Sequence, residues 1–284
     1  NDLLYYYNNP DKDLSELSFT FRDYMVAYTE LMASERVAQD KKYWESKIDT
    51  FPSAPTLNLK QMPDKVSKPH FKRCTKTFER EFWKRLENFA KKRGLMPSVV
   101  LCTAYAEVLA YWSNQPRLAI NFTVFNRYPF HNDVNKIVGD FTTTMLVGIE
   151  LEPHTSFFER IGCVQNTILE GLEHRHYDGI QFLAELSRHN NCKNNTALMP
   201  VVFTCMLFGD NSSEDWDSLG EIKYSISQTP QVYLDHQAVE TGGVLTVNWD
   251  YVEDLFEEEM IQTMFEQYTA LLEYFISEDK GEIE

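Results

Sequence analysis

Hydrophobic residues recur every three or four positions in several stretches of the chain, a spacing typical of amphipathic helices. This spacing predicts one long helix over Asp23–Lys47 and a closing helix over Leu255–Ile276. Between them, the run Pro97–Ser113 is apolar nearly all round, as expected of a buried helix that begins with proline. Further helices are predicted from Phe82 to a stop at Gly94, and over Phe157–Ser187 as two helices divided near Tyr177–Gly179.

Shorter runs rich in β-branched and aromatic residues predict strands between these helices. They are Arg73–Phe78, Leu118–Phe125, Thr143–Leu151, Val201–Leu207, Lys223–Ile226, Gln231–Leu234 and Leu245–Trp249. Strands and helices are mixed without an internal repeat. The pattern predicts an α/β fold with a mixed β-sheet flanked by helices.

Prolines interrupt the pattern after the first long helix. Four of them fall between Asp49 and Pro69, in the stretch FPSAPTLNLKQMPDKVSKP. Such a stretch is typical of a linker, or of a segment laid extended over a surface. We place the main boundary of the chain here.

Composition and charge exclude several classes of protein. The 284 residues carry 43 acidic and 27 basic side chains, a net charge of −16, which argues against nucleic acid and anionic membrane surfaces as partners. A hydrophobic fraction of 43% excludes disorder. No apolar run approaches the roughly 20 residues of a membrane helix, and no signal peptide is visible at the first residues. We expect a soluble, cytoplasmic piece of a longer protein.

The five cysteines are odd in number and scattered, without a CxxC pair. They predict free thiols in a reducing compartment rather than disulfides or a zinc site. The segment HRHYDG places His174 and His176 two positions apart, on different faces of a helix, which is poor geometry for joint metal binding. We interpret it as a surface helix that ends at Gly179.

Two polar positions stand out among the predicted strands. Strand alternation over Gln231–Leu234 and beyond places Gln231, Tyr233 and Asp235 on one face, where a carboxylate and an amide could orient and deprotonate a nucleophile. A solvated outer face is the alternative. Thr204 is a lone hydroxyl in the apolar run PVVFTCML, and its alternative role is a hydrogen bond to backbone.

Taken together and in order, nine segments resemble the heterocyclization domains of nonribosomal peptide synthetases, a branch of the condensation-domain superfamily. The segments are FRDYM (Phe21–Met25), YWESKID (Tyr43–Asp49), FPSAPTLNL (Phe51–Leu59), PSVVLCTAYAEVLAYWS (Pro97–Ser113), NFTVFNR (Asn121–Arg127), GDFT (Gly139–Thr142), PVVFT (Pro200–Thr204), SQTPQVYLD (Ser227–Asp235) and the pair Trp249–Asp250.

The resemblance implies a chloramphenicol-acetyltransferase-like fold of two lobes that form a V with a tunnel between them. Residues 1–20 then correspond to the tail of the N-terminal lobe, 21–69 to the inter-lobe helix and proline-rich connecting segment, and 70–284 to the C-terminal lobe. The Asp-rich motif of the family belongs to the N-terminal lobe and is absent from this chain. We therefore expect the isolated chain to be inactive.

The implied reaction joins a carrier-bound acyl or peptidyl thioester to carrier-bound Cys, Ser or Thr, and cyclodehydrates the product to a thiazoline or oxazoline. Siderophores and thiazole antibiotics are the usual settings. The implied partners are donor and acceptor carrier proteins, which supply phosphopantetheine arms, together with the N-terminal lobe and a neighbouring adenylation domain. No metal or cofactor of the domain's own is implied.

The family's residues for cyclodehydration correspond to Asp235 and Thr204. The supporting site members on matching motifs are Asn121, Gln231, Thr229, Ser227 and Asp140. The family usually has Ser where this chain has Cys205, and strand alternation turns that position away from the face of Thr204. An ordinary amide-forming condensation domain and a non-catalytic docking domain for carriers or tailoring enzymes are the alternative functions.

Overall fold

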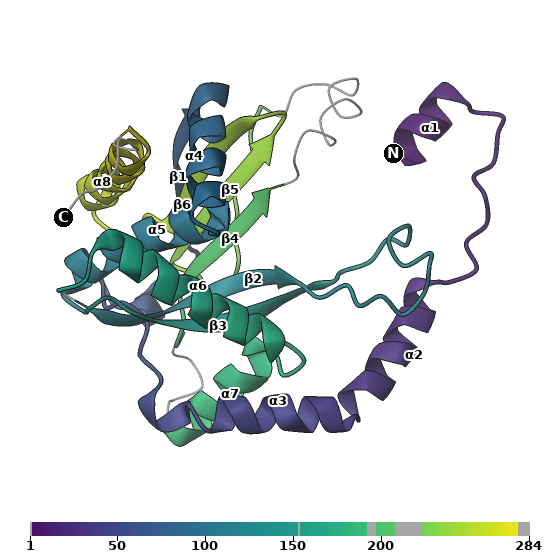
Figure 1. The fold of residues 1–284 in the computed structure, drawn as a ribbon, viewed down its shortest axis with the longest axis horizontal. Helices are drawn as coiled ribbons and strands as arrows, with labels where there is room; N and C mark the ends of the chain where they lie inside the picture. The colour runs from purple at the N-terminus through teal and green to yellow at the C-terminus, as the bar shows by residue number, and fades with distance from the viewer. Residues whose placement is uncertain (1, 153, 192–196, 208–222, 278–284) are drawn as a thin grey trace.

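A six-stranded mixed sheet organises the computed structural model, which describes residues 2–152, 154–191, 197–207 and 223–277. The strand order is β1-β6-β5-β4-β2-β3 (Figure 1). Strands β2, β4 and β5 run parallel, and the other neighbours pair antiparallel. The strands are β1 (Phe71–Phe78), β2 (Arg117–Phe125), β3 (Thr142–Glu150), β4 (Val201–Leu207), β5 (Leu234–Thr241) and β6 (Val244–Val252). The predicted fold class is confirmed.

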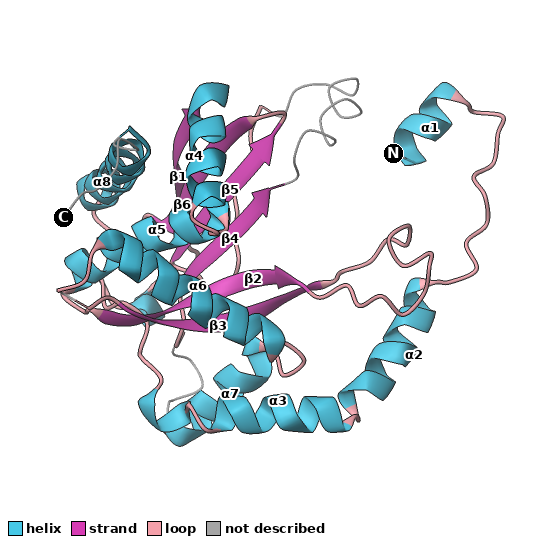
Figure 2. Cartoon of the chain, viewed as in Figure 1, coloured by secondary structure: helices cyan, strands magenta, loops and turns pink. Residues whose placement is uncertain are grey.

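The helices agree with the predicted pattern in most places (Figure 2). They are α1 (Asp2–Asn8), α2 (Phe21–Met32), α3 (Glu35–Glu45), α4 (Arg80–Lys92), α5 (Pro97–Ser113), α6 (Phe157–Glu173), α7 (Gly179–His189) and α8 (Glu258–Ser277), with short 3-10 turns at η1 (Ile48–Thr50) and η2 (Pro63–Lys65). No single helix among these is long and apolar enough to cross a membrane; only α4 and α5 together, bent by 99°, meet that test.

The helix predicted over Asp23–Lys47 and the strand predicted over Lys223–Ile226 are wrong. The helix expected over Asp23–Lys47 is two helices, because α2 ends at Met32 and a new helix starts after Ser34. The break lets α2 pack on the loop between β2 and β3 while α3 packs on α7. Lys223–Ile226 has no strand pairing and leads as irregular chain toward β5.

The hydrophobic core lies between one face of the sheet and helix α5. This helix begins at Pro97, whose missing N–H costs nothing there, and ten of its residues are buried. The sheet side of the core is an aromatic row formed by residues that face one another in the strand register, namely Trp249, His236, Phe203, Phe122 and Met145. Helices α4, α6 and α8 complete the same core.

A smaller apolar cluster joins α2 to the loop over residues 126–141. Tyr24 lies at its centre and packs its ring against Phe130 and Phe141, while its hydroxyl accepts from the Tyr128 amide at 3.2 Å. The Tyr24 hydroxyl donates to the Asn126 carbonyl at 2.6 Å. A Cβ at position 139 would lie 2.1 Å from the Phe21 ring, so this close approach requires the glycine found there.

The proline-rich segment runs extended along the main body of the protein, as predicted. The Ser53 carbonyl accepts from the Ala119 amide at 2.8 Å, and the Lys60 amide donates to the Leu255 carbonyl at 2.9 Å. Leu57 is buried in the main core. The first half of the segment is therefore held against the main body at Ser53, Leu57 and Lys60.

A buried carboxylate fastens α3 to the turn between α6 and α7. Asp40 is fully buried, and its oxygens lie 3.1 Å from Nδ1 of His174 and 2.8 Å from Nδ1 of His176. The amide of His176 donates to the same carboxylate at 3.1 Å. The predicted helix ending at Gly179 is wrong: α6 ends at Glu173 and α7 begins at Gly179. Both histidines lie in the turn between α6 and α7, so the spacing of a helix does not apply to them and both can contact Asp40.

Asp40→Ala should lower the free energy of unfolding by roughly 2–4 kcal/mol, because it leaves three hydrogen-bonding groups without their buried carboxylate partner. Urea denaturation measures this. Arg36→Ala is the matched control, since Arg36 is half exposed and lies 3.4 Å from the same carboxylate, and it should cost less than about 1 kcal/mol. Equal losses in the two variants would contradict a structural role specific to Asp40.

Candidate functional site

The sheet face opposite the aromatic row is polar in its middle. Arg73, Asp250, Asp235, Val202 and Asn121 face one another across five adjacent strands. Because side chains alternate along a strand, this row lies on the other face from His236 and Trp249. A second polar row lies next to it and consists of Thr75, Asn248, Gln237, Thr204 and Thr123.

Asp235 is the most buried carboxylate of the predicted site residues, with 6% of its surface exposed. Its Oδ2 accepts a hydrogen bond from Nε2 of Gln237 at 2.8 Å. Its Oδ1 is buried without a hydrogen-bond partner among the described residues. Burial raises the pKa of Asp235, and the hydrogen bond from Gln237 and the nearby Ser227 side chain oppose this in part. A carboxylate with one free oxygen and a raised pKa is suited to accept and return a proton.

Thr204 lies on β4 directly opposite Gln237, and is thus a diagonal neighbour of Asp235. Its hydroxyl donates to the Thr123 hydroxyl at 2.9 Å. Asn121 lies on β2, where its Oδ1 is buried and has no hydrogen-bond partner among the described residues. The structure therefore places Asp235, Thr204 and Asn121 on one face of three neighbouring strands.

An ion pair borders this group on the side of β1. The guanidinium of Arg73 binds both oxygens of Asp250, at 2.5 and 2.6 Å, and its Nη2 also donates to Oε1 of Gln237 at 3.3 Å. The Ser227 amide donates to Oδ2 of Asp250 at 2.6 Å. Ser227 therefore reaches the site from the irregular chain before β5.

Other predicted site residues lie outside the buried row. The prediction that Gln231 shares a strand face with Asp235 is wrong, because β5 begins at Leu234 and Gln231 occupies a turn with φ of 65°. Thr229 is exposed in the same turn, within 3.4 Å of the Ser227 hydroxyl. Asp140 is exposed before β3, where its carboxylate accepts from the Thr142 amide.

A groove of about 700 Å³ adjoins the Asp235 row. Phe71 and Val252 form part of its lining and follow the side-chain alternation of Arg73 and Asp250, and Tyr233 joins them from the residue before β5. Its walls come from residues 63–69 and 228–232, which include Thr229 and Gln231. Asp235 itself is not part of the lining, and the groove offers apolar surface two positions along the strands from Arg73 and Asp250.

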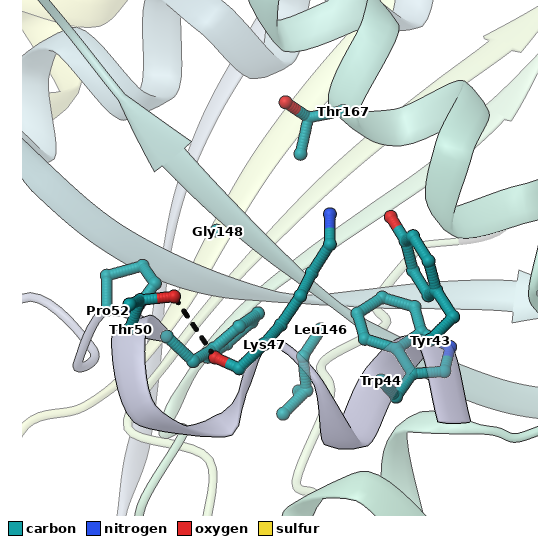
Figure 3. A pocket seen from close by; sticks show the side chains of 9 residues that line it. Tyr43, Trp44, Lys47, Thr50, Pro52, Leu146, Gly148 and Thr167 are labelled. Carbon is teal, nitrogen blue, oxygen red and sulfur yellow. Dashed lines mark hydrogen bonds between the residues drawn. The ribbon is translucent and has the colours of Figure 1, made fainter. Parts of the chain in front are cut away.

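A smaller hollow of about 210 Å³ lies at the edge strand β3 (Figure 3). The Lys47 side chain extends toward Thr167, between Tyr43 on one side and Pro52 on the other. The Lys47 ammonium lies 3.2 Å from the Glu170 carboxylate, which also accepts from the Tyr43 hydroxyl. Because β3 is three strands from β5, this hollow is separate from the Asp235 row.

Cys205 lies on the core side of β4, as predicted. It packs against the main core, and burial raises the pKa of its thiol to about 12. Cys74, Cys102 and Cys163 are also free thiols, while Cys192 lies outside the described residues. Among the described residues, no group of three or more His, Cys, Asp or Glu side chains is arranged to hold a metal ion.

Three residues of the polar face were missed as site residues in the sequence: Arg73, Gln237 and Asp250. Gln237 follows Asp235 by two positions, so continuing the predicted alternation would have found it. Asp250 belongs to the Trp249–Asp250 pair, but nothing in that pair reveals its partner. Arg73 reaches it across 177 positions of sequence through the β1–β6 pairing.

Comparisons with known proteins agree with this architecture. Residues 1–283 match a family model described as "Condensation domain". The chain is 44% identical over 95% of its length to bacitracin synthase 1 of Bacillus licheniformis, and 35% identical over 94% to phenyloxazoline synthase MbtB of Mycobacterium sp. (strain MCS). It spans 5% and 23%, respectively, of those proteins.

One solved structure with a similar fold is the cyclization-docking bidomain of the nonribosomal peptide synthetase EpoB from Sorangium cellulosum. It superposes with a TM-score of 0.87 at 32% identity, covering 97% of this chain and 56% of the bidomain.

Proposed function

The chain belongs to the condensation-domain family of nonribosomal peptide synthetases, and on that premise we propose that it is the part of a heterocyclization domain that closes the ring. In this proposal the domain condenses a carrier-bound acyl or peptidyl thioester with carrier-bound Cys, Ser or Thr. It then cyclodehydrates the amide to a thiazoline or oxazoline.

The observation that carries the proposal is the buried carboxylate of Asp235 with its free Oδ1, on the same sheet face as the Thr204 hydroxyl. Ring closure needs one group to take a proton from the attacking side chain and to return it to the departing hydroxyl. Asp235 fits that requirement, since burial raises the pKa of its carboxyl toward the range in which it both accepts and donates.

In condensation, the acceptor amine attacks the thioester carbonyl, the pantetheine thiolate leaves, and an amide forms. The side-chain sulfur or oxygen then attacks the amide carbonyl carbon as its proton passes to Oδ1 of Asp235. Asp235 passes this proton to the carbonyl oxygen, which becomes a hydroxyl in the tetrahedral intermediate. The Thr204 hydroxyl, turned away from Thr123, can donate a hydrogen bond to this oxygen as it forms. Asp235 then takes the proton of the ring nitrogen and delivers it to this hydroxyl, so that one water departs as the C=N bond forms.

The relatives support this choice among condensation-family activities. One is named a phenyloxazoline synthase, and the superposed structure is a cyclization domain. The groove lined by Phe71, Tyr233 and Val252 supplies apolar surface for the organic part of a substrate, two positions along the chain from Arg73, Asp235 and Asp250. Donor and acceptor carrier proteins are the proposed partners, and their phosphopantetheine arms bring the thioesters.

Intact-mass analysis tests the proposal on the full-length parent domain with loaded donor and acceptor carriers. We expect a condensed product that is lighter than the linear amide by about 18 Da, the mass of one water lost in the acid–base step. Condensation without that loss would favour an ordinary amide-forming domain. No condensation at all would favour a docking domain.

Cys205→Ser should leave ring closure within about twofold of the parent rate, because the side chain lies on the core side of β4. The variant places the family's usual residue beside Thr204. Product mass over a time course measures the rate. A drop beyond tenfold in a folded variant would show that this position acts on the polar face after all.

A further inference from the structure

Asp235 and Asp250 are directly opposed on the paired strands β5 and β6. Both carboxylates are nearly fully buried, and the negative charge of Asp250 on the opposed position disfavours ionisation of Asp235. The charge of Asp250 indeed acts to raise the pKa of Asp235, whereas the charge of Arg73 acts to lower it. A base at position 235 therefore needs a counter-charge on its neighbour.

Arg73 supplies this counter-charge from the next strand. Its planar fork binds both oxygens of Asp250, at 2.5 and 2.6 Å, in the bidentate arrangement that lysine cannot reproduce. The Arg73 side chain is only 19% exposed, so water screens the pair weakly.

The same guanidinium also determines which way Gln237 points. Nη2 of Arg73 donates to Oε1 of Gln237, which turns Nε2 of that amide toward Oδ2 of Asp235. One oxygen of Asp235 is thereby occupied, and Oδ1 is the oxygen left free. The order of contacts is Arg73 to Gln237 to Asp235, across strands β1 and β5.

We propose that Arg73 is a positioning residue for ring closure: it neutralises Asp250 and fixes the Gln237 amide, so that Asp235 stays ionised with only Oδ1 free to take a proton. The inference rests on the proposed function of Asp235 as the acid–base group. Arg73 itself touches no reacting atom.

The test is the pH profile of ring closure, measured as dehydrated product on the full-length parent domain with its loaded carriers. Asp235 acts as a carboxylate, so a raised pKa moves the acid limb of the profile to higher pH. For Arg73→Gln we expect a shift of about one unit or more, with roughly tenfold slower ring closure on that limb. Linear condensation product serves as the check that the variant is folded.

Two further variants separate charge from packing. The double variant Arg73→Gln/Asp250→Asn removes both charges. It should move the acid limb of the pH profile most of the way back to the parent position. Lys72→Gln is the matched control on the same strand, because Lys72 is exposed on the other face and pairs with Glu253 and Glu258. It should leave the profile at the parent position.

Arg73→Lys keeps the positive charge but loses the planar guanidinium that binds both oxygens of Asp250 and the Gln237 amide. The acid limb should stay near the parent position, while the rate falls because Gln237 is no longer held. An Arg73→Gln profile identical to that of the parent would overturn the inference and leave the proposed function standing. A parent domain that forms no ring at any pH would instead refute the proposed function itself.

Discussion

Asp235→Asn should lower ring closure by at least about 10²-fold while linear condensation product still forms. The amide cannot take the proton from the attacking thiol or hydroxyl, yet its oxygen still accepts the hydrogen bond from Gln237. Intact-mass analysis of the carrier-bound product separates the two steps, since ring closure alone loses water. Cyclisation at the parent rate would show that the carboxylate is not the acid–base group.

The stability of this variant provides an internal control. The pKa of Asp235 is raised above its ordinary value of 3.8, chiefly by burial, so the folded state binds its proton more tightly than the unfolded chain. The free energy of unfolding therefore falls as pH rises through the interval between those two pKa values, and the penalty is complete above it. Asp235→Asn removes this penalty. We expect it to be at least as stable as the parent at pH 7, measured by urea denaturation.

Thr204→Val should reduce ring closure by roughly 10²-fold, the usual cost of removing one hydrogen-bond donor from a developing tetrahedral oxygen. Valine keeps the branched shape on β4 and removes only the hydroxyl. Product mass over a time course measures both the linear and the dehydrated species. An unchanged ring yield would limit Thr204 to a structural role.

Thr123→Val is the matched control for this prediction. The Thr123 hydroxyl accepts the hydrogen bond from Thr204 and sits one strand farther from Asp235. If Thr204 acts directly on the substrate, the Thr123 variant should lose much less activity than the Thr204 variant. Equal losses would indicate that the pair acts only by holding the strands together. Thr204→Ser keeps the hydroxyl and should retain most of the activity.

Local patterns predicted those elements whose environment is uniform along their length. Pro97–Ser113 is apolar on all sides and begins with proline, and the structure has a core helix with those bounds. Val201–Leu207 likewise appears as predicted. The prediction of one helix over Asp23–Lys47 was wrong because its two halves pack on different partners, the first on the 126–141 loop and the second on α7.

At the candidate site, too, some predictions from local pattern were confirmed and others were wrong. Asp235 and Thr204 were visible as polar positions in apolar strands, and the family resemblance gave them their roles. The alternation that grouped Gln231 with Asp235 failed, since a turn with positive φ precedes the strand. Likewise, His174 and His176 meet at Asp40 only because α3 packs against their turn, 134 positions away for His174.

The sequence by itself therefore determined the mixed α/β class, the buried helix and the strand that carries Thr204. These follow from spacing over a few residues, which local backbone geometry converts into faces. The tertiary structure alone decided that Arg73 meets Asp250 and Gln237, and that Oδ1 of Asp235 is left free. Strand order sets those contacts, and strand order depends on the packing of the whole core rather than on any short stretch of chain.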